Sequence, residues 1–141
     1  MKDRFENSED EGASASAIST RERILFVDDE ELVATMGSRL LERHGYQVTY
    51  RTNGAEALAL FRIQPQRYDL LITDYFMPHM TGAELSREVL KIRPDLPIIL
   101  CTAGCKISEW EAKQYGVSEF MPKPFDSGKL IQSIRTLLDA Q

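Results

Sequence analysis

Short apolar runs alternate with longer segments of helical spacing from Arg21 to the end of the chain. Residues 24–27 form one such run, which stops abruptly at Asp28, and residues 69–73 form another, which stops at Asp74. Runs of this length are typical of strands that are buried on both faces of a sheet. Three further strands are predicted at residues 46–50, 97–101 and 117–121. The first of these three has the polar alternation expected of an edge strand.

The segments between these runs carry helix signals. The first helix repeats apolar residues at intervals of three and four and is predicted to stop at Gly45. Three later helices follow the pattern of a capping box, in which Glu stands three residues after Asn53, Thr81 or Ser108. The last helix begins at Asp126. Five strands alternating with five helices predict an α/β fold with a parallel sheet and helices on both of its faces.

The chain has 141 residues, enough for one domain with one core. Residues 1–20 are rich in Ser, Ala, Asp and Glu and contain almost no large apolar side chains. Such a segment buries too little surface to offset the entropy of ordering it. We therefore expect residues 1–20 to be a disordered tail or the remnant of a linker, and residues 21–141 to be the folded domain.

The overall charge and hydropathy argue against several classes of partner. The net charge is −5, and no run of Lys and Arg is longer than two, so we expect no nucleic-acid partner. No apolar run approaches the roughly 20 residues needed to cross a membrane, and the N-terminus lacks a secretory signal. A cytoplasmic location with no membrane contact is therefore predicted. Cys101 and Cys105 do not have the ligand spacing of a zinc site, and Cys101 is expected to be a buried thiol.

The residues that follow the predicted strands carry the candidate chemistry. Ligand sites of open parallel sheets lie at the carboxyl ends of the strands. Here those ends supply the carboxylates of Asp28, Asp29 and Asp74, and also the hydroxyl of Thr102 and the ammonium of Lys123. Oxygen ligands suit Mg²⁺, and a dication would relieve the repulsion among three carboxylates. Carboxylates are also known nucleophiles toward phosphorus.

Taken singly, each of these residues has a plainer interpretation. Asp28 or Asp29 could cap the first helix, and Asp74 could be a turn residue. Lys123 could be a solvated lysine, and Thr102 a loop hydroxyl. The co-occurrence of all five at strand ends favours the functional interpretation.

Four motifs carry a resemblance to a known family: VDDE at 27–30, ITDYFMPHMTG at 72–82, LCTAG at 100–104 and MPKPF at 121–125. Over residues 21–140 the chain resembles the receiver domain of two-component response regulators. The resemblance implies a flavodoxin-like (βα)5 fold, doubly wound, with five parallel strands in the order 2-1-3-4-5. It also implies Mg²⁺ as the cofactor, for which Mn²⁺ could substitute.

The resemblance further assigns roles to individual residues. Asp74 corresponds to the phosphoacceptor, and Asp28, Asp29, Asp74 and the backbone carbonyl of Phe76 correspond to the metal ligands. Thr102 and Lys123 correspond to the groups that contact the phosphoryl oxygens. Phe120 falls at the aromatic switch position, although a lone aromatic on a short strand is usually a core residue. The peptide bond between Lys123 and Pro124 is expected to be cis. Phe76 and Gly104 fall at positions that tune hydrolysis, and we expect slow-to-intermediate loss of the phosphoryl group.

The implied function is that of a phosphoacceptor in a phosphorelay, not of a turnover enzyme. A histidine kinase or a histidine phosphotransfer protein would donate the phosphoryl group, and the surface of the fourth helix, fifth strand and fifth helix would change in response. A pseudo-receiver that binds partners without phosphorylation is the alternative. Dimerisation through that surface, the downstream partner, and the choice between a stand-alone regulator and part of a hybrid kinase stay open. A phosphatase of the haloacid dehalogenase type is disfavoured, because VDDEE at 27–31 lacks its D-x-D spacing.

Overall fold

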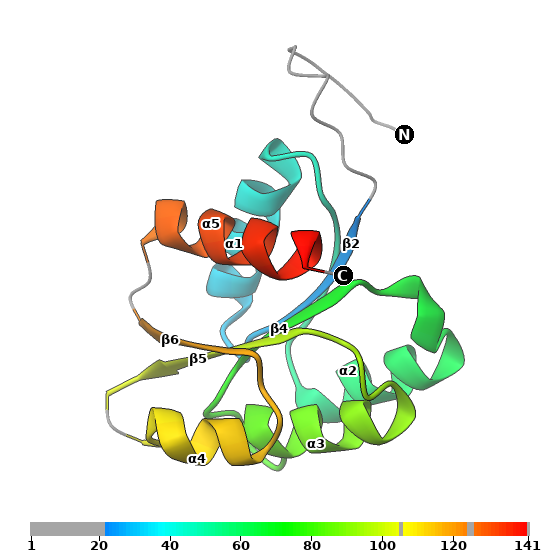
Figure 1. The fold of residues 1–141 in the computed structure, drawn as a ribbon, viewed down its shortest axis with the longest axis vertical. Coiled ribbons are helices and arrows are strands. Elements are labelled where there is room, and N and C mark those ends of the chain that lie inside the picture. Colours follow the sequence, from blue (N-terminus) through cyan, green and yellow to red (C-terminus); the bar gives the residue numbers. More distant parts are fainter. Residues whose placement is uncertain (1–21, 105, 124–125, 141) are drawn as a thin grey trace.

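The computed structural model describes residues 22–104, 106–123 and 126–140. Within them, five parallel strands form one sheet in the order β3-β2-β4-β5-β6, which confirms the predicted order 2-1-3-4-5 (Figure 1). The predicted tail at residues 1–20, together with Cys105 and Pro124, lies outside the described residues. The strands are β2 (Arg23–Val27), β3 (Gln47–Arg51), β4 (Leu70–Asp74), β5 (Ile98–Ala103) and β6 (Glu119–Lys123).

Helices cover both faces of the sheet, as the alternation of elements predicted. Figure 1 shows α1 and α5 on one face and α2, α3 and α4 on the other. A short 3₁₀ turn, η1 (Pro65–Arg67), joins α2 to β4. The helices are α1 (Glu31–Arg43), α2 (Gly54–Ile63), α3 (Gly82–Ile92), α4 (Glu109–Gln114) and α5 (Ser127–Asp139).

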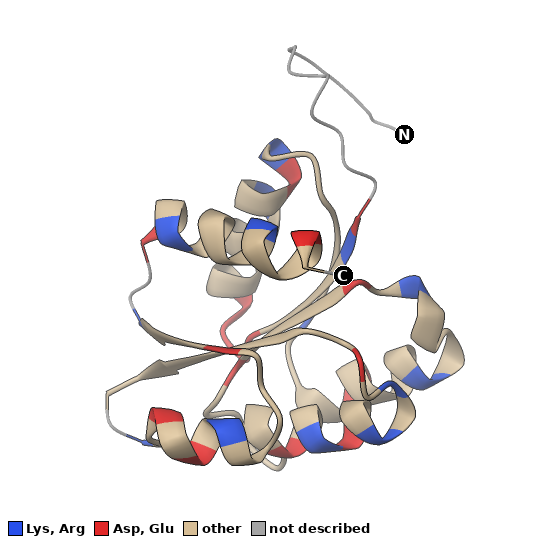
Figure 2. Ribbon diagram, in the orientation of Figure 1, with Lys and Arg blue, Asp and Glu red and all other residues tan. Residues whose placement is uncertain are grey.

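The core consists of two apolar layers, one on each face of the sheet. Alternate residues of β2 enter different layers: Leu25 and Val27 face α2 and α3, while Ile24 and Phe26 face α1 and α5. All four side chains are almost completely buried. Because β2 is buried on both faces, its residues form a continuous apolar run in the sequence. The charged positions of both signs lie mainly on the helices, and the strands are mostly uncharged (Figure 2).

The helix ends confirm most of the predicted capping signals. Thr81 and Ser108 each form a full capping box with the glutamate three residues later. Asn53 accepts a hydrogen bond from the backbone N–H of Glu56, which is half of that motif. Gly45 adopts a φ of 94° directly after α1, as expected of a residue that stops a helix.

One local feature was not predicted from the sequence: α2 ends at Ile63, and Pro65 opens a short 3₁₀ turn before β4. The Arg93 guanidinium donates hydrogen bonds to the carbonyls of Pro65 and Tyr68 and so fixes this turn against the end of α3.

Among the described residues, no helix has the length and apolar character needed to span a bilayer.

The far end of α5 is tied to the start of the sheet by a network of polar side chains. The Arg135 guanidinium donates to both carboxylate oxygens of Glu22 at 3.0 Å and to the Tyr46 hydroxyl at 3.2 Å. It also donates to Asp139 one turn further along α5, at 3.0 Å. This network lies at the opposite edge of the sheet from the carboxyl ends of the strands, so it stabilises the fold away from the candidate site.

Candidate functional site

Three carboxylates meet at the carboxyl edge of the sheet. Strand β2 delivers Asp28 and Asp29 directly after Val27, and β4 ends in Asp74. Since β2 and β4 are hydrogen-bonded neighbours, with Val27 opposite Thr73, the acids emerge side by side. One carboxylate oxygen from each of the three lies within 4.8 Å of the others. In Figure 2 the turn from β2 into α1 is acidic, as expected from the run of Asp and Glu at residues 28–31. We call Asp28, Asp29 and Asp74 the acid pocket.

Lys123 is the cation of the acid pocket. Strand β6 extends to Lys123, and its ammonium donates to Asp28 Oδ2 at 2.8 Å and to Asp74 Oδ1 at 3.3 Å. The side chains are well shielded, with exposed fractions of 17% for Lys123, 4% for Asp28 and 11% for Asp74. Asp29 is the more accessible member of the pocket. Three carboxylates and one ammonium leave the pocket with an excess of negative charge.

The environment shifts the pKa values of the two groups that face each other. Burial raises the pKa of Asp74 to about 6; the Lys123 charge opposes this shift, while Asp28 and Asp29 add to it. Burial lowers the pKa of Lys123, but its hydrogen bond to Asp28 and the nearby carboxylate charges outweigh that effect and leave it raised. At neutral pH, Asp74 is therefore ionised and paired with a charged lysine.

The plainer interpretation of Asp28 and Asp29 as helix caps is not what the structure shows. The N-cap of α1 is Glu30, which makes no side-chain capping bond. Asp28 Oδ1 instead accepts a hydrogen bond from the backbone N–H of Glu30 at 3.0 Å. This tight turn fixes one oxygen of Asp28, while its other oxygen accepts from Lys123.

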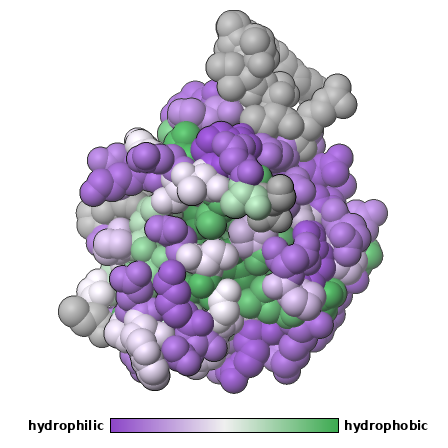
Figure 3. Space-filling model, in the orientation of Figure 1, coloured by the Kyte–Doolittle hydropathy of each residue, from purple (hydrophilic) through white to green (hydrophobic). Residues whose placement is uncertain are grey.

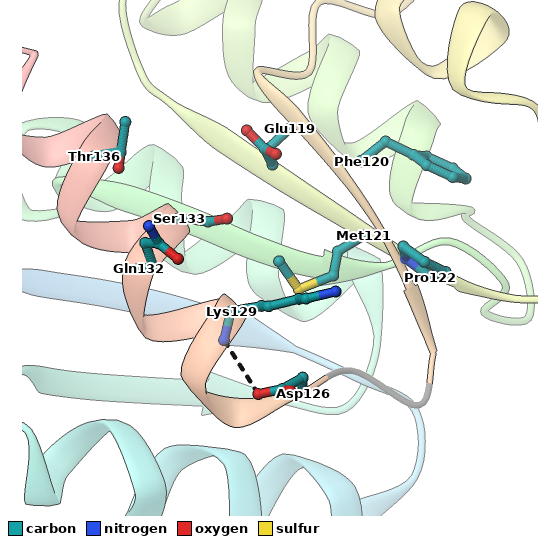
Figure 4. A pocket seen from close by; sticks show the side chains of 9 residues that line it. All are labelled: Glu119, Phe120, Met121, Pro122, Asp126, Lys129, Gln132, Ser133 and Thr136. Atoms are coloured by element: carbon teal, nitrogen blue, oxygen red, sulfur yellow. Dashed lines mark hydrogen bonds between the residues drawn. The ribbon is translucent and has the colours of Figure 1, made fainter.

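Thr102 lies near the end of β5, and Phe120 lies within the neighbouring strand β6. Thr102 is 1% exposed, and its hydroxyl makes a long 3.5 Å hydrogen bond to the carbonyl of Ala103. Phe120 is half-buried and packs against the α2–α3–α4 layer. Figure 4 shows its ring on the side of β6 that faces away from α5. Cys101, opposite Asp74 in the ladder, is a buried free thiol as predicted, and burial raises its pKa to about 12.

The loop after Asp74 is held by backbone contacts. The N–H of Tyr75 donates to the carbonyl of Cys101, and the N–H of Gly82 donates to the carbonyl of Tyr75 at 2.7 Å. His79 has a φ of 72°, and the N–H of Met80 donates to the carbonyl of Pro78 across it. This is a γ-turn of the uncommon, strained kind. Nothing in the sequence pattern marked His79 for that conformation.

Phe76 and Gly104 lie on the two loops that leave β4 and β5. The Phe76 side chain is 57% exposed, an unusual position for a large aromatic ring. The Lys106 ammonium lies 5.2 Å from the centre of that ring. Gly104 has a φ of 72°, and a Cβ placed there would meet no atom within 4 Å. The sequence predicted the positions of Phe76 and Gly104 but gave no sign of Lys106.

A groove runs between β6 and α5. Figure 4 shows side chains from both elements around it, and Figure 3 shows hydrophobic residues across the middle of this face, between more hydrophilic ones. Its volume is about 530 Å³. Asp126 closes one end, where its carboxylate accepts hydrogen bonds from the backbone N–H groups of Gly128 and Lys129. The lining residues are Glu119, Phe120, Met121, Pro122, Asp126, Lys129, Gln132, Ser133 and Thr136.

The fold and the site together define a class: a doubly wound α/β protein with an acid pocket and a paired lysine at the carboxyl edge of its sheet. Residues 24–135 match the model of the response regulator receiver domain family. The chain belongs to this family.

Named relatives and solved structures agree with this assignment. The chain is 38% identical over 117 residues to the response regulator MprA of Mycobacterium leprae, which covers 82% of this chain and 50% of that protein. It is 30% identical over 120 residues to the uncharacterized transcriptional regulatory protein YbdJ of Bacillus subtilis, covering 83% and 51% respectively. The chain thus spans about half the length of the curated relatives it matches.

Among solved structures, a receiver domain from Clostridium thermocellum aligns with a TM-score of 0.81 and 28% identity, covering 84% of this chain and 95% of that one. The chemotaxis protein CheY4 of Vibrio cholerae aligns with a TM-score of 0.75 and 30% identity, covering 84% and 99%. The structural match therefore extends over nearly the whole of each of these domains.

Proposed function

We propose that Asp74 accepts a phosphoryl group from a phosphohistidine on a histidine kinase or a histidine phosphotransfer protein. An Oδ atom of Asp74 attacks phosphorus, the bond from phosphorus to the imidazole nitrogen breaks, and the nitrogen keeps the electron pair. The products are an aspartyl phosphate and a free histidine. We take residues 21–141 as the receiver unit, which acts as a phosphoacceptor and not as a turnover enzyme.

The position of Asp74 in the acid pocket is the observation that carries this proposal. Its carboxylate is 11% exposed, so a donor can reach it, yet it lies 3.3 Å from the Lys123 ammonium. With a pKa of about 6 it is a carboxylate nucleophile at neutral pH. A fixed cation beside the acceptor stabilises the charge on the transferring phosphoryl oxygens, and phosphoryl transfer requires little more from a protein.

The acid pocket also fits Mg²⁺, with Mn²⁺ as a substitute. Mg²⁺ prefers oxygen ligands and is usually held by one or two carboxylates together with water and phosphate oxygens. Asp28, Asp29 and Asp74 offer oxygens within 4.8 Å of one another, and we propose the Phe76 carbonyl as a further ligand. When bound, the ion would neutralise negative charge on the phosphoryl oxygens.

We further propose that phosphorylation changes the surface formed by α4, β6 and α5. The Thr102 hydroxyl loses only a long hydrogen bond if it turns toward a phosphoryl oxygen. Phe120 is half-buried and would move inward behind it. The groove between β6 and α5 would then change shape, and a protein partner or a second copy of the chain would recognise it. The cis peptide between Lys123 and Pro124 stays a prediction.

Labelling with a small phosphodonor tests the proposal. Acetyl phosphate with Mg²⁺ should add one phosphoryl group to the wild-type chain, as seen by intact-mass spectrometry, and chelation with EDTA should prevent it. Asp74→Asn should abolish labelling. Asp69→Asn is the matched control: Asp69 lies directly before β4, at the opposite edge of the sheet, and its carboxylate accepts from the Arg23 N–H at 2.8 Å.

Two results would contradict the proposal. Undiminished labelling of Asp74→Asn would place the acceptor elsewhere. A folded wild-type chain that takes no label and shows no spectral response to beryllofluoride would favour the pseudo-receiver instead. Loss of labelling in Asp69→Asn would show that the assay reports fold integrity and not the acceptor.

A further inference from the structure

The contact between Lys106 and Phe76 joins the two loops that border the acid pocket. Phe76 lies two residues after Asp74 on the loop that leaves β4, and Lys106 lies four residues after Thr102 on the loop that leaves β5. Since β4 and β5 are adjacent, with Asp74 opposite Cys101, both loops emerge at the same edge. The Lys106 ammonium lies 5.2 Å from the Phe76 ring centre, within range of a cation–π contact.

Core packing holds this ring only in part. Phe76 is 57% exposed, whereas Met77, the next residue, is 2% exposed and belongs to the core layer. The Phe76 ring can therefore adopt other positions over the loop at little packing cost. A lysine on the opposite loop, attached through a flexible four-carbon chain, supplies an attraction that favours the observed position.

We propose that Lys106 is a positioning residue that keeps the Phe76 ring beside Asp74 and thereby slows hydrolysis of the aspartyl phosphate. The inference rests on the proposed function. In hydrolysis, a water oxygen forms a bond to phosphorus, the bond from phosphorus to Asp74 Oδ breaks, and a proton passes to solvent. The products are the Asp74 carboxylate and inorganic phosphate. With the ring fixed on the loop two residues after Asp74, water would reach the phosphorus less often.

The size of the effect follows from the strength of the contact. A cation–π contact at an exposed site shifts an equilibrium about two- to fivefold. Loss of the Lys106 cation should therefore raise the fraction of time for which the ring stands aside, and with it the hydrolysis rate, by about two- to fivefold. Gly104, on the loop that leaves β5, contributes no side chain, and a Cβ placed there would meet no atom within 4 Å. The Phe76 ring is thus the apolar group whose position Lys106 affects.

The test uses the full chain, labelled with acetyl phosphate and Mg²⁺ and then freed of donor. The decay of the aspartyl phosphate is followed by intact-mass spectrometry. Lys106→Met should shorten the lifetime about two- to fivefold, whereas Lys106→Arg should keep it near wild type, because a guanidinium also stacks on aromatic rings. Lys91→Met is the matched control, since Lys91 is an exposed lysine of α3 whose ammonium bonds Glu88 at 3.1 Å.

A double-mutant cycle separates positioning from a direct charge effect. Phe76→Ala should itself shorten the lifetime, and Lys106→Met should then have no further effect. Equal lifetimes for wild type and Lys106→Met, or the same fold-change in the Phe76→Ala background, would overturn the inference. A wild-type chain that takes no label at all would instead overturn the proposed function, on which the inference rests. The labelling step therefore distinguishes the two failures.

Discussion

Gly82 is the position where a single added methyl group should disturb the site most. Gly82 is the first residue of α3, and it is buried beside the loop that follows Asp74. A Cβ at Gly82 would lie 2.0 Å from the carbonyl oxygen of Asp74 and 2.9 Å from Leu100 Cδ1. Gly54 provides a matched comparison, because it is the buried first residue of α2 and the three atoms nearest to a Cβ there all belong to the Met80 side chain, at 3.0–3.1 Å.

The two contacts should have very different costs. Side-chain Cβ atoms essentially never approach other atoms closer than 3.0 Å, so Gly82→Ala must move the α3 backbone and the Asp74 carbonyl apart by about 1 Å. Overpacking of this kind costs about 1–3 kcal/mol, and the gain from replacing glycine in a helix offsets about 0.5–1 kcal/mol. Because the clash is with a backbone oxygen at 2.0 Å, the upper part of that cost applies, and we expect Gly82→Ala to lose about 1–2 kcal/mol. Gly54→Ala should change stability by less than about 0.5 kcal/mol, because a methionine side chain can move aside.

Urea unfolding followed by far-ultraviolet circular dichroism measures both values. A lower midpoint with an unchanged slope identifies a loss of native-state stability. Gly82→Ala should also slow labelling by acetyl phosphate, since the displaced carbonyl belongs to the proposed acceptor residue. If Gly82→Ala proved as stable as Gly54→Ala, α3 would not be packed against Asp74 as tightly as the structure indicates, and the reasoning would fail.

Three further predictions concern the charges and the backbone. Burial raises the pKa of Asp74 to about 6, so the ionised carboxylate destabilises the folded state above that pH. In EDTA at pH 7.5, Asp74→Asn should therefore be more stable than wild type by about 1–2 kcal/mol, a value reduced to allow for partial exposure. The folded wild type binds the extra proton below that pKa, so the advantage should shrink as the pH falls from about 6 toward 4; a constant difference in unfolding midpoint would contradict this. His79→Gly should have a free energy of unfolding about 1 kcal/mol higher than His79→Ala, because glycine adopts a positive φ without strain and alanine does not. It should therefore unfold at a higher urea concentration. Arg135→Lys should lose about 0.5–1 kcal/mol in thermal unfolding, because an ammonium cannot pair with both oxygens of Glu22, and the loss should diminish at high salt.

The strands could be predicted because burial on both faces leaves a clear apolar signal. Residues 24–27 and 69–73 fall within one residue of β2 and β4. The predicted ends of the last two strands were too early: β5 continues to Ala103 and β6 to Lys123. The pairing of β5 with β6 continues past the apolar runs to the carboxyl edge, where Ala103 pairs with Lys123. A prediction based on apolar residues alone ends before these positions. Lys123 therefore belongs to a strand, which fixes its backbone beside the acid pocket.

The features that the sequence did not predict depend on contacts between distant segments. The 3₁₀ turn at Pro65 is held by Arg93, from the far end of α3. The contact between Lys106 and Phe76 joins two loops 30 positions apart. The strained φ of His79 arises where the loop must return its chain to α3 within a few residues. Local propensity carries no information about such contacts, because they exist only once the sheet has brought the loops together.

The arrangement of Lys123 is suited to the proposed function, because the same cation could pair with Asp74 before and after phosphorylation. Its shorter hydrogen bond, at 2.8 Å, is to Asp28, and the 3.3 Å bond to Asp74 is the longer of the two. Asp28 is itself fixed by the Glu30 N–H, so the ammonium is anchored by a residue that does not react. Under the proposed function, an Oδ atom of Asp74 can gain a phosphoryl group while Lys123 stays in place and redirects one N–H. Such preorganisation lowers the cost of transfer, since the cation need not be recruited when charge develops.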